Sequence, residues 1–587
     1  MSTKNDLPGI ELLRHSAAHV LAAAVLEMFP EAKFGIGPAI ENGFYYDFEL
    51  PRTLIPEDLP LLEEKMKEII KANHPLEKQE ISVDNARQHF EKLGQNYKVE
   101  LINDLESAGE KKVSVYKFDS FVDLCSGPHI ESSGKINPKA FALTKISGAY
   151  WKGDAEKAQL QRIYGVVFEN EKELKEYKIQ QEEAAKRDHR KLGKELDLFV
   201  FSDLVGPGLP LYTNKGAFIR REIIKYCNEL QGAIGYREVW TPNMNRAELF
   251  KISGHYEKYK EDMFKVISNH TKEEYFLKPM NCPQHTQIFA SKMRSYKDLP
   301  IRIADFANLY RDEKPGELLG LARLRCFCQD DGHCFCSEDQ IKSEFLAVLS
   351  VIKKAMKTFG MQYAIRLSLW DPKNSEKYLG EPAIWESSQK LLEEILKENK
   401  IEYTSAIGEA AIYGPKMDLI AKDSLGREWQ LSTIQLDFIM PVRFGLNYID
   451  SDGKQKTPVM IHRAIIGSPE RFMGVLIEHY AGAFPLWLSP VQVTIIPVSE
   501  KFSDYAEEVK TKLLEKNIRV EMNDKGESLG KRISETERQK IPYILVVGER
   551  EVAEKSVNVR TRAVKNQQTL SVDKFIEKIA KEIEEKK

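Results

Sequence analysis

The spacing of hydrophobic residues near the start of the chain predicts a helix followed by a pair of strands. Residues 12–26 place Leu, Val and Ala side chains at helical intervals, so we expect an amphipathic helix there. Residues 34–50 alternate short apolar and polar stretches around Asn42 and Gly43. Because Asn-Gly favours tight hairpin turns, this pattern predicts a strand, a turn and a second strand.

Further elements are expected before residue 200. A charged stretch at 57–72 predicts a helix, and short strands are expected around 98–102 and 113–118. Residues 171–198 have high helix propensity, little apolar content and no proline. This composition predicts one long, solvated helix that bridges two domains.

The rest of the chain divides near Pro485 and Pro490. Before them, 301–313 and 321–335 predict an antiparallel strand pair, and after them strands alternate with helices, which indicates a compact α/β domain with a partly parallel sheet. Because 587 residues exceed what one core organises, several domains are expected. The predicted bounds are 1–180, a helical linker at 181–198, 199–484 and 485–587.

Composition and charge narrow the class of protein. A hydrophobic fraction of 42% and a charged fraction of 30% argue against extensive disorder. A net charge of -3 excludes a uniformly basic nucleic-acid coat, so any such contact must come from local patches. No apolar run reaches membrane-spanning length. The first residues resemble neither a secretory signal nor a transit peptide. The seven cysteines do not indicate a disulfide framework. We therefore expect a cytoplasmic protein without a membrane span.

Phosphate-binding chemistry must come from arginines. The segment 526–532 resembles a Walker loop only superficially, because its glycines are one residue too close and Arg532 stands where Ser or Thr should be. Arg311 and Arg325 flank a predicted hairpin loop and can point at one face, where planar guanidinium groups suit phosphate oxygens. Arg471 lies at the start of a predicted helix. Each arginine alone is more often a surface residue, but the three together favour a nucleotide site.

The segments that carry these arginines resemble a known family. YREVWTP, YRDEKPGELLGLARLRCF and GSPERF resemble motifs 1, 2 and 3 of class II aminoacyl-tRNA synthetases, at 236–242, 310–327 and 467–472. KPMNCP, QDDGH, YGPK and MIHR narrow the resemblance to threonyl-tRNA synthetases, at 278–283, 329–333, 413–416 and 460–463. The resemblance runs from about residue 10 to the C-terminus.

The resemblance implies a multidomain α+β and α/β fold. An N-terminal α+β editing domain that hydrolyses seryl-tRNA, a class II catalytic domain on an antiparallel sheet and a C-terminal α/β anticodon-binding domain are expected in that order. Class II domains pair through motif 1, so a homodimer is expected. The family typically carries a ubiquitin-like domain ahead of the segment with His15, and we expect this chain to lack it.

The implied reaction joins L-threonine and ATP into threonyl-adenylate and then transfers the acyl group to tRNA(Thr). By resemblance, Arg311 holds the α-phosphate and Glu313 the adenine amino group. Phe327 stacks on adenine with Arg471 on its other face, while Arg325 and Arg471 reach the outer phosphates, and magnesium shields the pyrophosphate. The implied ATP site also includes Gln430 and Thr433, and the implied catalytic set also includes Lys416 and His255.

A zinc ion, one per subunit, is also implied. By resemblance its ligands are Cys282, His333 and His462, which no local spacing rule would reveal. Spacing alone points to a different C-x-C set, although buried cysteines acting as small hydrophobic residues are the simpler interpretation of it. That alternative set is Cys326, Cys328, Cys334 and Cys336.

The implied zinc leaves a fourth position open, which explains substrate choice. The threonine amino and hydroxyl groups can both bind there, and a site that must hold a hydroxyl rejects valine by about 10⁴-fold or more. Serine lacks only a methyl group, worth about 1–3 kcal/mol, so it is not rejected. By resemblance Asp331 balances the threonine ammonium. The other residues expected to line this pocket are Gln329, Tyr413 and Gln435.

A second cluster of residues near the N-terminus is expected to remove that error. His15 and His19 share one helix face, and Asp123, Cys125 and His129 supply an acid, a thiol and a third imidazole. From spacing alone, a tetrahedral zinc site and a metal-free hydrolytic pocket are equally favoured, and scattered structural residues are the third alternative. Resemblance to threonyl editing domains favours the metal-free pocket, in which water polarised by a neutral histidine attacks the seryl ester. Alanyl-tRNA synthetase editing domains share the pattern, and this leaves metal occupancy open. Tyr46 and Lys98 complete the implied site.

The C-terminal domain is expected to read the anticodon. Asn523, Glu551 and Arg560 match the base-reading positions of the resembling family, although each alone is more often a surface residue. Hydrogen bonds to splayed-out bases are the usual way to read RNA sequence. Two rival interpretations remain at this point: a non-catalytic RNA-binding paralogue, and a free metallo-esterase that would not need residues 199–484.

Overall fold

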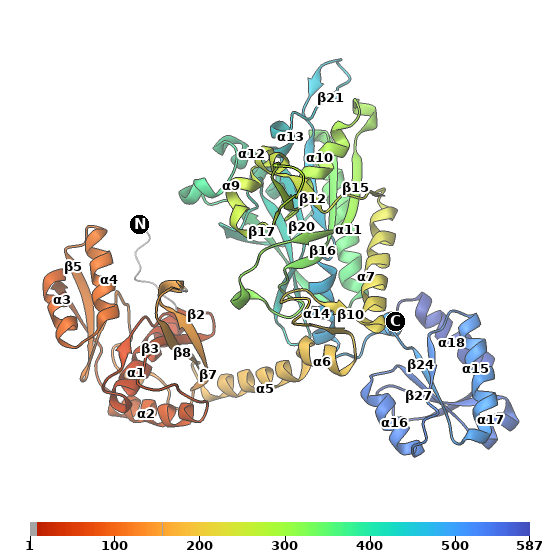
Figure 1. The fold of residues 1–587 in the computed structure, drawn as a ribbon, viewed down its shortest axis with the longest axis horizontal. Helices are drawn as coiled ribbons and strands as arrows, with labels where there is room; N and C mark the ends of the chain where they lie inside the picture. The colour runs from red at the N-terminus through yellow and green to blue at the C-terminus, as the bar shows by residue number, and fades with distance from the viewer. Residues whose placement is uncertain (1–8, 155) are drawn as a thin grey trace. The chain divides into compact units, whose positions relative to one another are not determined.

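The computed structural model describes residues 9–154 and 156–587, and it divides into two compact units (Figure 1). These are Met1–Glu182 and Glu183–Lys587. Each unit has its own buried hydrophobic core. A search of the described helices finds none that is both long and apolar enough to span a bilayer.

The first unit packs two helices on an antiparallel sheet. Helix α1 (Gly9–Met28) buries Ala17, Val20 and Leu21 against this sheet, as its hydrophobic spacing predicts. The sheet has the order β1-β3-β8-β7, with β2 paired to β3. Its strands are β1 (Lys33–Phe34), β2 (Ala39–Ile40), β3 (Gly43–Glu49), β7 (Phe141–Tyr150) and β8 (Gln159–Val167), and the second helix is α2 (Asp58–Ala72).

A smaller layer completes this unit and corrects one prediction. The strand expected at 113–118 is confirmed, but the strand expected at 98–102 is wrong, because these residues lie in helix α4. Lys98 and Ile102 are buried at a spacing of four, so packing on one helix face overrides the local apolar run. The elements of this layer are β4 (Glu77–Ser82), α3 (Val83–Lys92), α4 (Asn96–Ser107), β5 (Lys112–Phe118) and β6 (Phe121–Leu124).

The long helix expected at 171–198 is two helices. Helix α5 (Glu171–Arg187) buries only Leu174 and is solvated as predicted. The chain leaves helical geometry at Asp188, whose side chain accepts a hydrogen bond from Arg190 N and caps helix α6 (His189–Glu195). Unlike α5, α6 buries part of its length, including His189.

An eight-stranded sheet forms the middle of the second unit. The predicted antiparallel pair is confirmed, with Ile301 opposite Phe335 and Tyr310 opposite Cys326. The sheet is mainly antiparallel, as expected, with parallel pairing only at its two edges. In order across the sheet its strands are β11 (Arg237–Glu238), β15 (Ile301–Tyr310), β16 (Cys326–Cys336), β23 (Val459–Ala464), β20 (Glu428–Asp437), β19 (Lys416–Lys422), β17 (Gln362–Leu369) and β18 (Thr404–Ile407).

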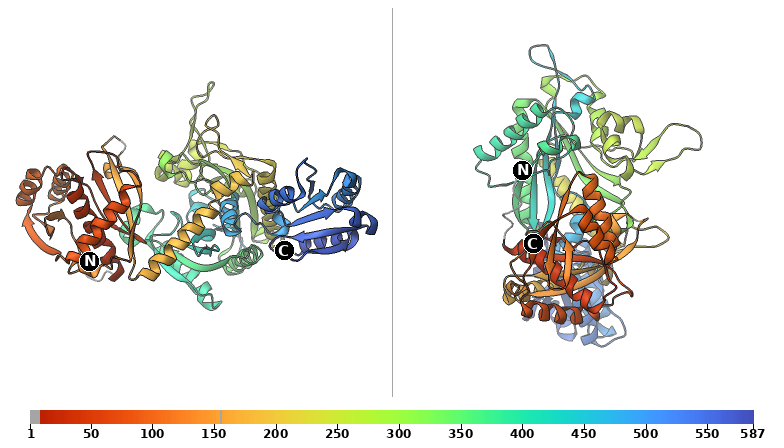
Figure 2. Two further views of the ribbon diagram at one scale, coloured as in Figure 1. Left: turned by 90° about the horizontal axis from the view of Figure 1, so that it is seen from below. Right: turned by 90° about the vertical axis from the view of Figure 1, so that its left-hand side faces the viewer.

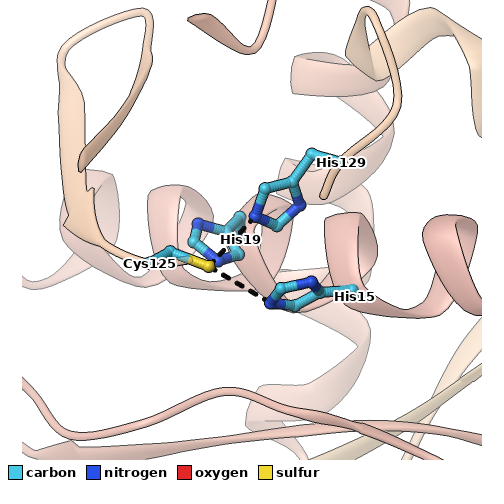
Figure 3. Close-up of side chains that lie close together, drawn as sticks. All are labelled: His15, His19, Cys125 and His129. Atoms are coloured by element: carbon cyan, nitrogen blue, oxygen red, sulfur yellow. Dashed lines mark hydrogen bonds between the residues drawn. The ribbon is translucent and has the colours of Figure 1, made fainter. Parts of the chain in front are cut away.

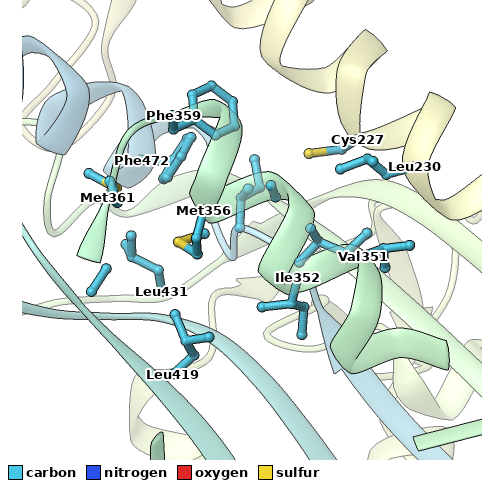
Figure 4. Close-up of a cluster of buried hydrophobic side chains, with 14 of the residues drawn as sticks. Cys227, Leu230, Val351, Ile352, Met356, Phe359, Met361, Leu419, Leu431 and Phe472 are labelled. Atoms are coloured by element: carbon cyan, nitrogen blue, oxygen red, sulfur yellow. The ribbon is translucent and has the colours of Figure 1, made fainter. Parts of the chain in front are cut away.

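Three helices pack on this sheet. Figure 4 shows Cys227 of α7 (Asn214–Ala233), Met356 of α11 (Ile341–Thr358) and Phe472 of α14 (Pro469–His479) in one core with Leu419 of β19. Replacing such a buried Phe with Ala typically costs about 3–5 kcal/mol. The remaining helices and strands of this region are β9 (Phe199–Val200), β10 (Leu211–Tyr212), β12 (Met244–Arg246), α8 (Ala247–Ser253), α9 (His255–Tyr259), β13 (Lys265–Val266), β14 (Tyr275–Leu277), α10 (Cys282–Ala290), α12 (Pro382–Glu398) and α13 (Met440–Arg443).

A short hairpin stands out from this region. Strands β21 (Tyr448–Ile449) and β22 (Gln455–Lys456) pair antiparallel and lie outside the eight-stranded sheet. The hairpin projects in Figure 1 and in the right-hand view of Figure 2.

The end of the chain forms an α/β domain with a partly parallel sheet, as predicted. Strand β24 runs parallel to both β25 and β26, while β26, β27 and β28 pair antiparallel. Helices α15 and α18 share one core with this sheet. The elements are β24 (Val493–Pro497), α15 (Ser503–Glu515), β25 (Val520–Met522), α16 (Leu529–Arg538), β26 (Tyr543–Val547), α17 (Glu549–Glu554), β27 (Ser556–Thr561), β28 (Gln568–Ser571) and α18 (Val572–Glu584).

Candidate functional site

A cavity of about 680 Å³ lies between the β15–β16 hairpin, strand β20 and the start of α14. Arg311 and Phe327 both line it, with the Arg311 guanidinium 5.1 Å from the centroid of the Phe327 ring. Arg471, in the first turn of α14, has a buried Nε atom without a hydrogen-bond partner in the described part of the chain. Burial lowers the pKa of both arginines, which shows that their charges are poorly solvated. An anion in this cavity would therefore meet the guanidinium groups of Arg311 and Arg471.

The loop of the hairpin is closed by contacts to Glu313. Arg325 donates from Nε and Nη2 to the Glu313 carbonyl oxygen at 3.0 and 2.9 Å. Arg323 Nε donates to the Glu313 carboxylate at 2.8 Å. Glu313 lines the cavity, whereas Arg325 does not. The expected contact of Arg325 with the outer phosphates thus requires it to leave the Glu313 carbonyl.

A second cavity, of about 220 Å³, shares two residues with the first. Arg311 and Gln329 line both cavities, so a group held in one lies next to a group held in the other. Tyr413 Oη donates to Gln435 Oε1 at 2.9 Å, and burial raises the pKa of the Asp331 carboxyl to about 7. The predicted site residues that line the second cavity are Cys282, Arg311, Gln329, Asp331, His333, Tyr413, Lys416, Thr433, Gln435 and His462.

Two other predicted residues lie at or behind these walls. Gln430 lines the first cavity and donates from Nε2 to Asp418 Oδ1 at 2.9 Å, which fixes its amide. His255 is fully buried, with Nδ1 2.8 Å from Ser253 Oγ and Nε2 3.0 Å from Met280 Sδ. Burial lowers the pKa of His255 to about 3. Because Met280 rather than His255 lines the cavity, the structure places this histidine one layer behind the surface.

Cys282, His333 and His462 meet at the edge of the second cavity. Their ligand atoms lie within 4.8 Å of one another, and all three side chains are buried. His333 on β16 and His462 on β23 are directly opposite partners in the sheet, with His333 Nε2 3.0 Å from His462 Nδ1. Cys282 enters from the first turn of α10. Strand pairing therefore brings together residues that are 129 positions apart.

This donor set fits a metal ion of zinc type. His462 Nε2 lies 2.9 Å from Asp437 Oδ2, and His333 Nδ1 lies 2.6 Å from His285 Nδ1. Each histidine thus uses one ring nitrogen for an outer partner and directs the other toward the shared space, as metal-binding histidines do. The sequence analysis did not identify Asp437 or His285. Nothing in their local sequence marks them, although His285 follows the KPMNCP segment by two residues.

The structure does not support the C-x-C alternative. Cys334 and Cys336 belong to the hydrophobic core, where the side chain of each is fully buried. Cys326 and Cys328 face a separate cavity near Tyr212. Among the residues that the structure describes, these four cysteines do not form a group with metal-ligand spacing. Alternate residues of one strand share a face, but the two C-x-C pairs lie on different parts of β16.

The predicted editing residues converge in the first unit. His15 and His19 come from one face of α1, and Cys125 and His129 follow strand β6 (Figure 3). Cys125 Sγ lies 3.3 Å from both His15 Nε2 and His129 Nε2, and the Gly127 N–H donates to the same sulfur at 3.3 Å. The thiol is thus the centre of the cluster.

The remaining predicted residues, Tyr46, Lys98 and Asp123, form a hydrogen-bonded group next to this cluster. Tyr46 Oη donates to Asp123 Oδ2 at 2.6 Å, and Lys98 Nζ donates to Tyr46 Oη at 3.0 Å and forms an ion pair with Asp123. His19 Nδ1 lies 3.5 Å from the Asp123 carboxylate.

Burial controls protonation in this pocket. It lowers the pKa of His15, His19 and His129 and raises the pKa of the Cys125 thiol to about 11. At neutral pH the pocket therefore holds neutral imidazoles and a neutral thiol beside one ion pair.

The three predicted anticodon residues come from separate elements. Asn523 follows β25 and has a buried Oδ1 without a hydrogen-bond partner among the described residues. Glu551 in α17 accepts a hydrogen bond from Gly548 N at 3.0 Å. Arg560 lies on β27, and strands β24 and β26 separate it from β25 in the sheet. The structure does not bring these residues into one tight cluster.

Three segments of the chain match known protein families. Residues 264–480 match a family described as tRNA synthetase class II core domain (G, H, P, S and T). Residues 492–582 match an anticodon binding domain, and 113–164 match the threonyl and alanyl tRNA synthetase second additional domain.

Curated relatives and one solved structure agree with these matches. Threonine–tRNA ligases of Gloeobacter violaceus and Thermus thermophilus are 47% and 48% identical, covering 98% and 100% of this chain and 92% and 90% of those proteins. A crystal structure titled RNA binding domain of threonyl-tRNA synthetase from Cryptosporidium parvum is similar with a TM-score of 0.64 and 38% identity, covering 67% of this chain and 98% of that one. Nothing in the comparisons supports the non-catalytic alternative. The chain therefore belongs to the threonine–tRNA ligases, which are class II aminoacyl-tRNA synthetases with an editing domain.

Proposed function

We propose that this ligase forms threonyl-adenylate where its two cavities meet, at Arg311 and Gln329. The observation that carries this proposal is that both residues line both cavities. Threonine in the smaller cavity then directs its carboxylate at the α-phosphorus of ATP in the larger one. A carboxylate oxygen bonds to phosphorus, and pyrophosphate leaves with its electron pair and its magnesium.

The arginines supply the charge that this step needs. Arg311 lines both cavities, and Arg471 presents an Nε atom that has no hydrogen-bond partner among the described residues. Phe327 stacks on adenine, and Glu313 accepts from its amino group. Because negative charge builds up around phosphorus as the bond forms, fixed guanidinium groups stabilise that state more than the bound substrates. Lys416, Gln430 and Thr433 complete the walls.

Cys282, His333 and His462 would hold one zinc ion per subunit. Zinc bound there would supply a Lewis-acid position for the amino and hydroxyl groups of threonine, and this would favour threonine over valine. The protein's own residues shape the surrounding pocket. Tyr413 stacks on the His462 ring at 4.4 Å, and Asp331 lies beside His333 where it can face the threonine ammonium. Gln329 and Gln435 form the other polar walls.

The pocket around Cys125 is assigned to hydrolysis of seryl-tRNA without a metal ion. The hydrogen-bonded cluster already satisfies the thiol and two imidazoles, and this supports the metal-free assignment. A neutral histidine takes a proton from water, whose oxygen attacks the seryl carbonyl carbon. The ester bond breaks, and the ribose oxygen leaves and is protonated. Serine and uncharged tRNA result.

The remaining assignments concern partners and domains. Trp240 in motif 1 is 81% exposed, which supports a homodimer formed through motif 1. Asn523, Glu551 and Arg560 are assigned to the anticodon of tRNA(Thr). We assign editing to 1–180, a linker to 181–198, synthesis to 199–484 and anticodon binding to 485–587.

The replacement Arg311→Ala tests the synthetic site. It should lower the rate constant of adenylate formation by about 10²–10³-fold, a factor typical of losing one donor aimed at developing charge. ATP binding should weaken by less. Pre-steady-state measurement of adenylate formation, together with ATP binding measured separately, checks this. Equal losses in both quantities would mean that Arg311 binds ATP without favouring the transition state.

A further inference from the structure

His189 connects three segments that lie far apart in the sequence. It is the first residue of α6, is buried, and has Nδ1 2.6 Å from Glu478 Oε1 at the end of α14. The Leu321 N–H, in the loop of the β15–β16 hairpin, donates to His189 Nε2 at 3.0 Å. Because Leu321 N can only donate, Nε2 is the acceptor and the ring proton lies on Nδ1.

This bonding pattern excludes a simpler role for the histidine. Asp188, His189 and Glu478 have the spacing of a metal site. Both nitrogens of His189 are nevertheless already bonded, one to a carboxylate and one to a backbone N–H. No lone pair of the ring is free to bind an ion.

The loop fits closely around the histidine. Gly320 has a φ of +47°, and a Cβ atom there would lie 2.2 Å from His189 Nε2. The Leu321 side chain is buried in the core. Two residues further on, Arg323 holds the carboxylate of Glu313, and both Glu313 and Leu321 line the larger cavity. The hydrogen bond to His189 thus fixes the part of the loop that faces the ATP site.

We propose that His189 is a positioning residue for ATP binding, which it serves by fixing the β15–β16 loop to helix α14. Helix α14 presents Arg471 in its first turn and Glu478 near its end. His189 therefore ties the loop that carries Glu313 to the helix that carries Arg471, and sets the separation of the two walls between which adenine would lie. The inference rests on the proposed role of this cavity in binding ATP.

Two replacements separate the two hydrogen bonds of His189. His189→Asn keeps an N–H near the position of Nδ1 but places no acceptor at the position of Nε2. His189→Gln can place its amide oxygen there and accept from Leu321. We expect His189→Asn to raise the KM for ATP by about tenfold, the factor that corresponds to one buried hydrogen bond, and to leave the KM for threonine within twofold. His189→Gln should restore most of the loss.

Hydrogen exchange of the full-length protein gives a readout independent of activity. The peptide that contains Leu321 should exchange about tenfold faster in His189→Asn than in the parent, and His189→Gln should slow it again. The control Lys191→Ala changes an exposed side chain of the same helix and should alter neither quantity.

A second variant approaches the contact from the loop, in case the histidine variants fold poorly. Gly320→Ala would displace the loop from an intact His189 and should raise the KM for ATP in the same way. The proposal is overturned if these variants leave the KM for ATP unchanged, or if the KM values for ATP and threonine rise together. Arg311→Ala tests the ATP site itself. If Arg311→Ala slows adenylate formation while the His189 variants keep the parent KM for ATP, only the role of His189 is refuted.

Discussion

The two cysteine–histidine clusters of this protein use the same residue types in opposite arrangements. In the first unit, Cys125 lies at the centre and its sulfur is 3.3 Å from two imidazole nitrogens. In the second unit, His333 Nε2 and His462 Nδ1 lie 3.0 Å apart. The other ring nitrogen of His462 contacts Asp437, and that of His333 contacts His285. The ligand atoms of both clusters lie within 4.8 Å of one another. The clusters differ in their outer partners: His15 and His129 bond neutral oxygens of Pro128 and Ser16, whereas His462 bonds the carboxylate of Asp437.

We infer from this difference that the charge of the outer partner distinguishes the two clusters as metal sites. A carboxylate behind His462 fixes which ring nitrogen is available and raises its basicity. In the first unit Asp123 lies 3.5 Å from His19 Nδ1, but it is already paired with Lys98 and accepts a hydrogen bond from Tyr46. We therefore expect zinc in the second unit and a metal-free hydrolytic pocket in the first.

The largest expected effect comes from removing the thiol of the second cluster. Cys282→Ser should lower threonine-dependent ATP–pyrophosphate exchange by more than about 100-fold, since even outer partners of a metal ligand contribute 10–100-fold. The double replacement Cys334→Ala, Cys336→Ala serves as the control and should retain exchange, at some cost in stability because both residues are core. Strong loss of exchange in the control would revive the C-x-C set.

The next effect concerns the first cluster. A double His15→Ala, His19→Ala variant should charge threonine at close to the parent rate, because both residues lie outside the ATP-binding unit. It should also accumulate seryl-tRNA, with hydrolysis slowed by about 10²–10⁴-fold through loss of the general base. Deacylation of purified seryl-tRNA measures this. Hydrolysis at the parent rate would remove the editing assignment.

A smaller effect is expected from the outer partner of His462. Asp437→Asn keeps the size of the side chain but loses its charge, so zinc affinity should fall by about 10–100-fold. Competition with a chromophoric chelator measures that affinity. Exchange should recover at saturating zinc, unlike in Cys282→Ser. An unchanged affinity would mean that Asp437 has no part in holding the ion.

The smallest effect is a pH dependence of stability in the first unit. Burial holds the pKa of His19 well below its ordinary value of 6.5. Below pH 6.5 the unfolded chain therefore binds a proton that the folded chain does not, and stability falls as the pH drops, by up to about 1.4 kcal/mol per pH unit. Hydrogen exchange of α1 between pH 7.5 and 5 measures this slope, which should be shallower in the His15→Ala, His19→Ala variant. An equal slope in both would contradict the prediction.

The sequence predicts the architecture better than the details of the sites. Hydrophobic spacing identifies α1 and the β15–β16 pair, because one face of each is packed against a core. It fails at residues 98–102, where the burial of Lys98 beside Asp123 and Tyr46 depends on distant partners. It also misses the break at Asp188, which becomes visible only as a cap on α6.

The zinc ligands illustrate the same limit. His333 and His462 meet because β16 and β23 pair in one register, which no local pattern contains. They were identified only through the family resemblance, and the outer residues Asp437 and His285 were not identified at all. Such residues are hard to predict because they lie far apart in the sequence, although their side chains are ordinary metal ligands.

Metal content of the purified full-length protein tests the central contrast most directly. Elemental analysis should find one zinc per chain in the parent, one in Cys125→Ser and none in Cys282→Ser. The first two results together would show that the thiol-centred cluster binds no ion, and the third would locate the zinc. Two zinc ions per chain in the parent, or loss of zinc in Cys125→Ser with retention in Cys282→Ser, would contradict the account.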